Sequence, residues 1–170
     1  IDFYSGDFIS DHTNLYTNLN HVDLLSTHNF NFNAHGSIIK NKLYYYLSGR
    51  YVYYQGVYEG RRVYNPWSYG TVEENEGGES YWHVFGDNSS LGDNKFVPME
   101  WNLKQSGQLN LIWKPTHTTK IKYSHFSDDK DFQEYDRYYI LNPDGNLLRY
   151  NYGRTDILQL NKSLNQNSFF

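Results

Sequence analysis

The stretch HNFNFNAHGSII, residues 28–39, decides the fold that the sequence predicts. Apolar or small residues alternate in it with polar ones, so the pattern has a period of two. A helix would need a period of about 3.6 residues, and the asparagines and glycine of this stretch are poor helix formers. The alternation therefore predicts a β-strand with one apolar face and one polar face.

The segment that follows repeats this alternation after a short turn at Lys40-Asn41. Leucines and tyrosines such as Leu43 and Leu47 share one parity, and Ser48 and Arg50 belong to the other. Two alternating runs joined by such a short turn predict a β-hairpin. We expect the complete set of strands at residues 2–10, 27–39, 42–56, 100–114, 119–127 and 148–162.

The connections between these strands alternate in length. They are long, short, long, short, long and short, at residues 11–26, 40–41, 57–99, 115–118, 128–147 and 163–168. A soluble meander has no need of this asymmetry, whereas a transmembrane β-barrel has short periplasmic turns and long extracellular loops. The sequence therefore predicts an all-β fold, an antiparallel meander of six to seven strands that forms part of a transmembrane β-barrel.

Composition narrows the classes of protein further. The formal net charge is −4 and the 15 lysines and arginines are scattered, which argues against nucleic acid as a partner. Aromatic residues make up 19% of the 170 positions, and their rings suit a strand surface at a water interface. The absence of cysteine excludes a disulfide framework. A mean hydropathy of −0.80 excludes transmembrane helices, but not strands that are apolar on one face only.

Two sets of side chains mark the expected membrane contact. The first is a lipid-facing set that comprises Phe30, Phe32, Ile38, Leu43, Leu47, Leu109, Leu111 and Trp113. The second is an aromatic girdle, with Tyr44 to Tyr46 and Trp113 beside short turns and with Tyr53 and Phe126 near long loops. Ordinary packing is the alternative for the second set, because Tyr and Trp favour strands in any β-protein.

No pattern of residues predicts catalysis. The chain lacks the nucleophile-elbow, zinc-protease and phosphate-loop motifs, so we expect it not to be an enzyme and to have no catalytic or cofactor-binding residue. The seven histidines are spread along the chain. His28 and His35 fall on opposite faces of one strand, where they cannot chelate the same ion. We expect structural or solvent-facing roles for the histidines.

The longest connection, residues 57–99, is the expected ligand-binding segment. Loops on a rigid scaffold commonly carry binding sites, and exposed rings can stack on sugars or planar ligands. The candidate ligand-binding residues are Trp67, Tyr81, Trp82, Asp87 and Asp93. The alternative is that these rings pack the loop against its neighbours.

Residues 86–94 are rich in the oxygen ligands that calcium prefers. They do not match the EF-hand pattern, and turn formation explains the same residues, so calcium stays an alternative to having no cofactor. We interpret Asn142 to Asn146 as a tight turn. We interpret a cluster of acidic residues as part of a solvated loop, comprising Asp128, Asp129, Asp131, Glu134 and Asp136.

A series of short motifs spans most of the chain. In order they are FYSGDFISDHT at 3–13, SGRY at 48–51, GRRVYNP at 60–66, VPM at 97–99, WKPT at 113–116 and YILNPDGN at 139–146. Together, their order and spacing resemble the early barrel of TonB-dependent outer-membrane receptors from Bacteroidetes-type bacteria. The resemblance implies a barrel of about 22 strands with a plugged lumen. It also implies nutrient import driven by energy that TonB passes from the inner membrane.

On this resemblance, residues 1–170 are one incomplete domain, a segment of a receptor barrel in the bacterial outer membrane. The chain has no plug domain, no TonB-contacting box and too few strands to close such a barrel. The expected partners are outer-membrane lipid, the rest of the barrel and its plug, the TonB system through that plug, and a siderophore, glycan, peptide or similar nutrient. The chain starts at Ile1 without Met and ends at Phe170 as a new strand begins, so we read both ends as cuts.

Two other classes of protein stay open. One is a complete small barrel of eight strands that serves adhesion or membrane integrity, which the chain length permits. The other is a soluble carbohydrate-binding β-sandwich, which the Tyr and Trp content suggests. A sandwich would stay monodisperse without detergent, whereas an isolated barrel segment would aggregate through its edge strands and its apolar face.

Overall fold

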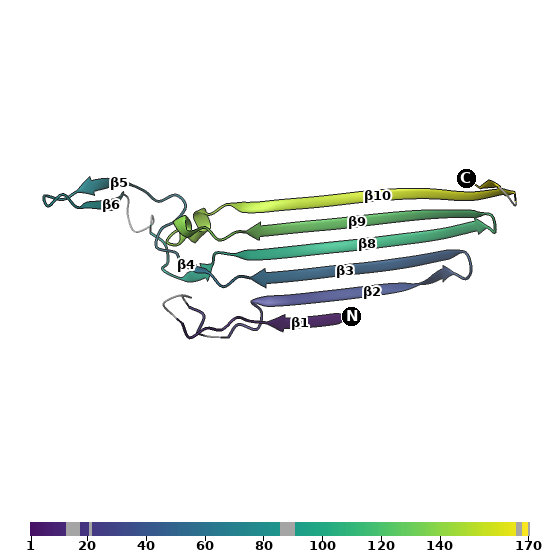
Figure 1. The fold of residues 1–170 in the computed structure, drawn as a ribbon, viewed down its shortest axis with the longest axis horizontal. Coiled ribbons are helices and arrows are strands. Elements are labelled where there is room, and N and C mark those ends of the chain that lie inside the picture. The colour runs from purple at the N-terminus through teal and green to yellow at the C-terminus, as the bar shows by residue number, and fades with distance from the viewer. Residues whose placement is uncertain (13–17, 21, 86–90, 166–167, 170) are drawn as a thin grey trace.

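The computed structural model describes residues 1–12, 18–20, 22–85, 91–165 and 168–169. Seven of its strands form one antiparallel sheet in the order β1-β2-β3-β8-β9-β10-β11 (Figure 1). They are β1 (Asp2–Gly6), β2 (Thr27–Ile39), β3 (Leu43–Gln55), β8 (Trp101–Thr116), β9 (Thr119–Gln133), β10 (Leu148–Asn165) and β11 (Ser168–Phe169). The predicted all-β antiparallel meander is confirmed. Nowhere in the described ranges is there a helix with the length and apolar character to span a membrane.

The connections lie at the two ends of the sheet as the sequence predicts. The short turns that join β2 to β3 and β8 to β9 are at one end, where β10 also ends and β11 pairs with it (Figure 1). The long connections gather at the other end and carry two small sheets, β4 (Glu59–Arg61) with β7 (Phe96–Pro98) and β5 (Tyr69–Glu74) with β6 (Ser80–Phe85). Two short 3-10 helices, η2 (Arg137–Tyr139) and η3 (Pro143–Gly145), follow β9.

The register assigns the side chains of the sheet to two faces. Leu47 pairs with Ala34 on β2 and with Leu109 on β8, and we call the face with these residues the apolar face. Ser48 pairs with Asn33 and with Gln108, and they lie on the polar face. The apolar and polar residues that alternate along these strands therefore lie on opposite faces of the sheet.

The sheet has no hydrophobic core. Among the described residues, the buried hydrophobic side chains are Leu19 and Met99, and both lie outside the seven-stranded sheet. Large apolar side chains on the sheet stay exposed instead, such as Trp113 at 48% and Leu158 at 75%. The backbone ladder and cross-strand side-chain pairs therefore hold the sheet together, because the part of the chain that the structure describes packs no second layer on either face.

Several predicted boundaries are wrong. β1 ends at Gly6 rather than residue 10, and β8 continues through Pro115, where a bulge between Trp113 and Thr116 accommodates the missing N–H. Ile38 also falls at a bulge, so Ile39 rather than Ile38 pairs with Leu43.

The largest error concerns the acidic cluster. Asp128, Asp129 and Asp131 are on β9, which runs to Gln133, and only Glu134 and Asp136 lie in the loop. Aspartate disfavours strands, but here neighbouring strands provide cations. Lys104 Nζ lies 3.1 Å from Asp128 Oδ1, and Arg154 Nη2 lies 2.6 Å from Asp129 Oδ2.

A cross-strand pair of an aromatic ring and a glycine braces the middle of the apolar face. Phe32 pairs with Gly49, and a Cβ atom built on Gly49 would lie 2.2 Å from Cε1 of the Phe32 ring. The ring therefore covers the glycine backbone, and a side chain at Gly49 would displace it.

We predict that Gly49→Ala lowers the free energy of unfolding by about 1–3 kcal/mol, the usual cost of overpacking. Denaturant unfolding in detergent micelles measures this change. The control is Gly153→Ala, whose added Cβ would meet only Asp128 O at 3.6 Å, an ordinary contact. Equal stabilities of the two variants would contradict the bracing role of Phe32.

Candidate functional site

The long connections build a packed structure at one end of the sheet. We call residues 56–68, 91–100 and 134–147 the loop platform. The rings of Tyr58 and Tyr135 stack with centroids 4.3 Å apart. Met99 is fully buried, and its N–H donates to Tyr58 O at 2.9 Å. Backbone hydrogen bonds join the segments, because Arg61 N donates to Ile140 O at 2.8 Å and Val63 N donates to Leu141 O at 3.0 Å. The platform is therefore a folded unit with its own packing.

Arg62 is the centre of an ionic network on this platform. Its Nε donates to Asp144 Oδ2 at 2.6 Å and its Nη2 donates to Asp144 Oδ1 at 3.2 Å, a bidentate pair between residues 82 positions apart. Asp93 lies on the other side, with its Oδ2 at 3.8 Å from Arg62 Nη1 and at 3.4 Å from Lys95 Nζ. The network ties the connection between β4 and β7 to the loop after β9.

The pKa values of two platform groups reflect these contacts. The hydrogen bond to Asp144 raises the pKa of Arg62 above its ordinary value. The backbone N–H of Lys95, which donates to Asp93 Oδ1 at 3.1 Å, lowers the pKa of Asp93, and the side chains of Lys95 and Arg62 add to this effect. Both shifts favour the charged forms of the two side chains.

The predicted ligand-binding residues do not form one site. Trp67 is 67% exposed at the edge of the platform. Tyr81 and Trp82 are on β6 of the β5–β6 hairpin, where they pair with Glu73 and Val72, and this hairpin extends away from the sheet (Figure 1). Asp93 belongs to the Arg62 network, and Asp87 lies outside the described residues.

The residues that the sequence did not single out are Arg62 and Asp144. Both belong to motifs that were noted, the GRRVYNP stretch and the turn at Asn142 to Asn146. That turn is confirmed as the 3-10 helix η3. The opposite charges of Arg62 and Asp144 were not enough to predict that they pair, because the chain contains many other acidic residues.

The described residues contain no group of three or more His, Cys, Asp or Glu placed to hold a metal ion. Calcium at residues 86–94 stays a prediction, because residues 86–90 are outside the described ranges. At Asp93, a cation would have to compete with Lys95 and Arg62 for the carboxylate.

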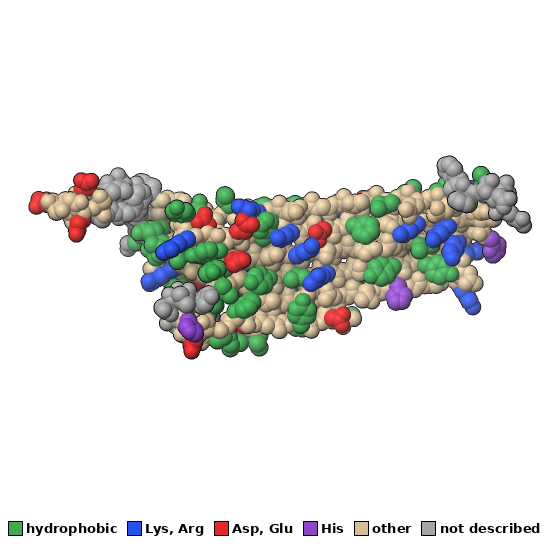
Figure 2. Space-filling view, viewed as in Figure 1, with side chains coloured by type: hydrophobic (Ala, Val, Ile, Leu, Met, Phe, Trp, Pro, Cys, Tyr) green, Lys and Arg blue, Asp and Glu red, His purple; other side chains and the backbone are tan. Residues whose placement is uncertain are grey.

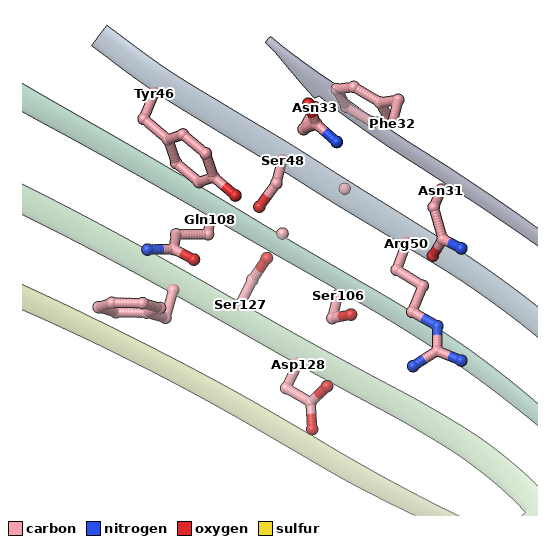
Figure 3. Close-up of a pocket in the computed structure, with 13 residues that line it drawn as sticks. Asn31, Phe32, Asn33, Tyr46, Ser48, Arg50, Ser106, Gln108, Ser127 and Asp128 are labelled. Atoms are coloured by element: carbon pink, nitrogen blue, oxygen red, sulfur yellow. The ribbon is translucent and has the colours of Figure 1, made fainter. Parts of the chain in front are cut away.

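The polar face has a hollow at its centre. Its volume is about 440 Å³, and the small side chains of Ser48 and Ser106 lie near its centre (Figure 3). Arg50 and Asp128 lie at one end and Tyr46 at the other. The hollow therefore offers hydrogen-bonding groups and both signs of charge to a polar occupant, and it contains no nucleophile paired with a general base.

The sheet as a whole presents two contrasting open surfaces. The face turned to the viewer in Figure 2 mixes charged and apolar side chains along its length. The apolar face carries leucines and aromatics near the short turns, including Leu47, Leu109 and Leu111.

No protein-family model, no curated protein and no solved structure matches this chain. The proposed function therefore rests on the chemistry of the two faces of the sheet.

We predict that Asp144→Asn loosens the platform by about 1 kcal/mol, the typical worth of a partly exposed, well-aligned ion pair. Hydrogen exchange at the Val63 and Arg61 amides, which bond to the η2–η3 segment, reports this opening. The control is Glu76→Gln at the exposed turn of the β5–β6 hairpin, which should leave exchange at these amides unchanged. Unchanged exchange in Asp144→Asn would show that the pair does not hold the two segments together.

The titration of Asp93 gives a second prediction. Because its folded pKa is depressed, its charged contacts stabilise the platform above the ordinary carboxyl pKa of about 3.9. That stabilisation is lost as the pH falls through the lower, folded pKa. An NMR titration of the Asp93 side chain should have its midpoint below the ordinary value. Lys95→Gln should keep most of the shift, because the largest cause is a backbone N–H; a midpoint at or above the ordinary value refutes the assignment.

Proposed function

We propose that this chain is part of the wall of a bacterial outer-membrane β-barrel, of the class of TonB-dependent receptors, and that it serves nutrient import. The support that carries most weight is the open apolar face of an antiparallel meander with alternating turn lengths. A soluble protein would cover that face with a second sheet or with helices. A lipid bilayer covers it without any further protein layer, provided that the strands close into a barrel.

The lengths of the strands support a membrane-spanning role. β8 has 16 residues, β9 has 15 and β10 has 18. Strands of globular proteins usually have about 5–6 residues, and about 9–11 residues cross a bilayer when tilted. These strands are therefore long enough to cross and to continue beyond the membrane on the long-loop side.

The aromatic girdle receives partial support. Trp113 lies beside a short turn with its ring about half exposed, as a ring at the interface would. Phe126 does not fit the girdle, because β9 continues to Gln133 and places Phe126 in mid-strand. It is on the polar face, where it pairs with Gln108 and lines the hollow.

In this proposal the partners follow from the two faces and the two ends. Lipid covers the apolar face, and the rest of the barrel pairs with the edge strands, since β11 already begins to run back along β10. The polar face and its hollow would face the lumen of the barrel. The plug, which connects the receptor to TonB, would lie in that lumen. The long-loop end with Trp67 and the β5–β6 hairpin faces outward, where the nutrient arrives.

A charge on either face tests the proposal. We predict that Leu47→Arg, on the apolar face near mid-membrane, lowers the free energy of unfolding in lipid vesicles by about 2–4 kcal/mol. Ser48→Arg is the matched control, because the neighbouring residue is on the polar face beside the hollow and its new charge would face water. The difference between the two variants isolates the lipid contact.

Two outcomes would count against this assignment. Equal effects of the two substitutions would mean that the apolar face does not meet lipid. A monodisperse, folded chain in buffer without detergent would favour a soluble β-protein instead, because an isolated wall segment exposes two sheet edges and an apolar face.

A further inference from the structure

We propose that the polar face of the sheet binds anions, and that the nutrient which passes along it is a small solute with two or more carboxylate or phosphate groups. This inference rests on the proposed function and narrows the class of its substrate from nutrients in general to multiply charged anions. It follows from a set of cationic side chains on the polar face that have no carboxylate partner among the described residues.

The register places an excess of positive charge on the polar face. Seven lysine and arginine side chains of the described strands belong to this face, whereas its carboxylates are Asp2 on β1 and Asp128 on β9. Seven cations against two carboxylates leave an excess of five positive charges. The chain as a whole has a formal net charge of −4, so positive charge is concentrated on this one surface.

Two of the seven cations are neutralised by ion pairs. Lys104 Nζ lies 3.1 Å from Asp128 Oδ1, and Arg149 forms an ion pair with Glu134 in the loop after β9. Across the ranges that the structure describes, the other five form no ion pair with a carboxylate, and they are Arg50, Lys114, Lys120, Lys122 and Lys130. These five side chains therefore remain available to an anion from outside the described residues.

Arg50 lies at the edge of the central hollow (Figure 3). Its described polar contact is long, since its Nε lies 3.5 Å from Asn29 Oδ1. A guanidinium presents a planar fork of donors that matches a carboxylate or a phosphate group. The hydroxyl groups of Ser48 and Ser106 line the same hollow, and its volume of about 440 Å³ is in the usual range of small-molecule sites. The hollow is therefore suited to an anionic group.

A second concentration of positive charge lies at the short-turn end. A groove of about 980 Å³ is lined there by five lysines, which are Lys40, Lys42, Lys114, Lys120 and Lys162. At this end, Figure 2 shows lysine, arginine and histidine side chains, and no aspartate or glutamate among those it colours.

The lysines of this groove are close neighbours. Lys114 N donates to Lys42 O at 2.7 Å, so these two residues are adjacent across the β3–β8 turn region. Like charges on neighbouring strands repel each other. An anion in the groove would relieve this repulsion, whereas an uncharged solute would not.

The hollow and the groove lie one after the other along the strands. Asp128 is the β9 member of the Arg50 row, and Lys120 lies eight residues farther toward the short turns, which corresponds to ~26 Å. This separation exceeds the screening length of about 8 Å at physiological ionic strength, so each site would attract an anion independently. Rings of arginine and lysine select anions in pores, and passage needs several sites of moderate strength. Two successive cationic sites meet that requirement.

A matched pair of solutes tests the proposal. The whole polypeptide that carries these residues is folded in micelles of an uncharged detergent, and isothermal titration calorimetry measures its Kd for benzene-1,3,5-tricarboxylate and for the uncharged benzene-1,3,5-trimethanol. We expect the tricarboxylate to bind at two sites and the trimethanol not to bind. Inorganic pyrophosphate is the third solute, and the tighter of the two anions identifies the preferred group as carboxylate or phosphate.

Two substitutions assign the sites to these residues. We expect Arg50→Gln to raise the Kd of one site and Lys120→Gln that of the other, each about five-fold, the effect of one partly exposed charge. The control is Arg154→Gln, which should leave both Kd values unchanged. Arg154 follows Gly153, the β10 member of the Arg50 row, and its own charge is on the apolar face, where it pairs with Asp129. If Arg50→Gln fails to fold, Lys114→Gln in the groove takes its place.

The outcomes separate this inference from the proposed function. Equal binding of the tricarboxylate by the unsubstituted protein and both variants would overturn the two anion sites. No binding of either anion would also overturn them, because another part of the polypeptide would then neutralise these cations. Both results leave the membrane wall intact, since Leu47→Arg and Ser48→Arg test it separately. Tighter binding of the trimethanol than of the anions would overturn the substrate class.

Discussion

The structure depends on one feature of its described residues: no layer formed by them covers the apolar face of the sheet. In a globular domain, burial of side chains such as Leu47 and Leu109 would supply the main stabilising free energy. Here that free energy is available only if something outside the described residues covers them. The backbone ladder fixes the register, and the register decides which residues need such cover.

The alternating residues of the sheet were enough to predict its strands and the arrangement of its ends. The stretch from His28 to Ile39 has one polarity on each face, and a slip of one residue would exchange the faces. The continuation of β9 through Asp128 and Asp129 was not predictable in the same way. Its cause is the cations of the neighbouring strands, Lys104 and Arg154, and no property of the segment alone reveals that pairing.

The candidate site was predicted less well than the sheet, for a related reason. The sequence predicted ligand binding by the connection between residues 57 and 99, which stays a prediction, and it did not predict how this connection packs. Met99 is buried against Gly60, and a Cβ on that glycine would lie 2.7 Å from Met99 Sδ. The packing therefore depends on a close contact that no local sequence pattern predicts. The pairing of Arg62 with Asp144 depends on the sheet that brings two distant connections to the same end.

That pairing has a consequence for the order of folding. Arg62 and Asp144 are separated by 82 residues, and closing so long a loop in an unfolded chain costs conformational entropy. The hairpin of β8 and β9 lies entirely inside that interval, and its own turn is short. Once the hairpin forms, it brings the two ends of the interval together, so the platform closes after the hairpin rather than with it. The outermost part of this structure would then be the last to assemble and the first to open.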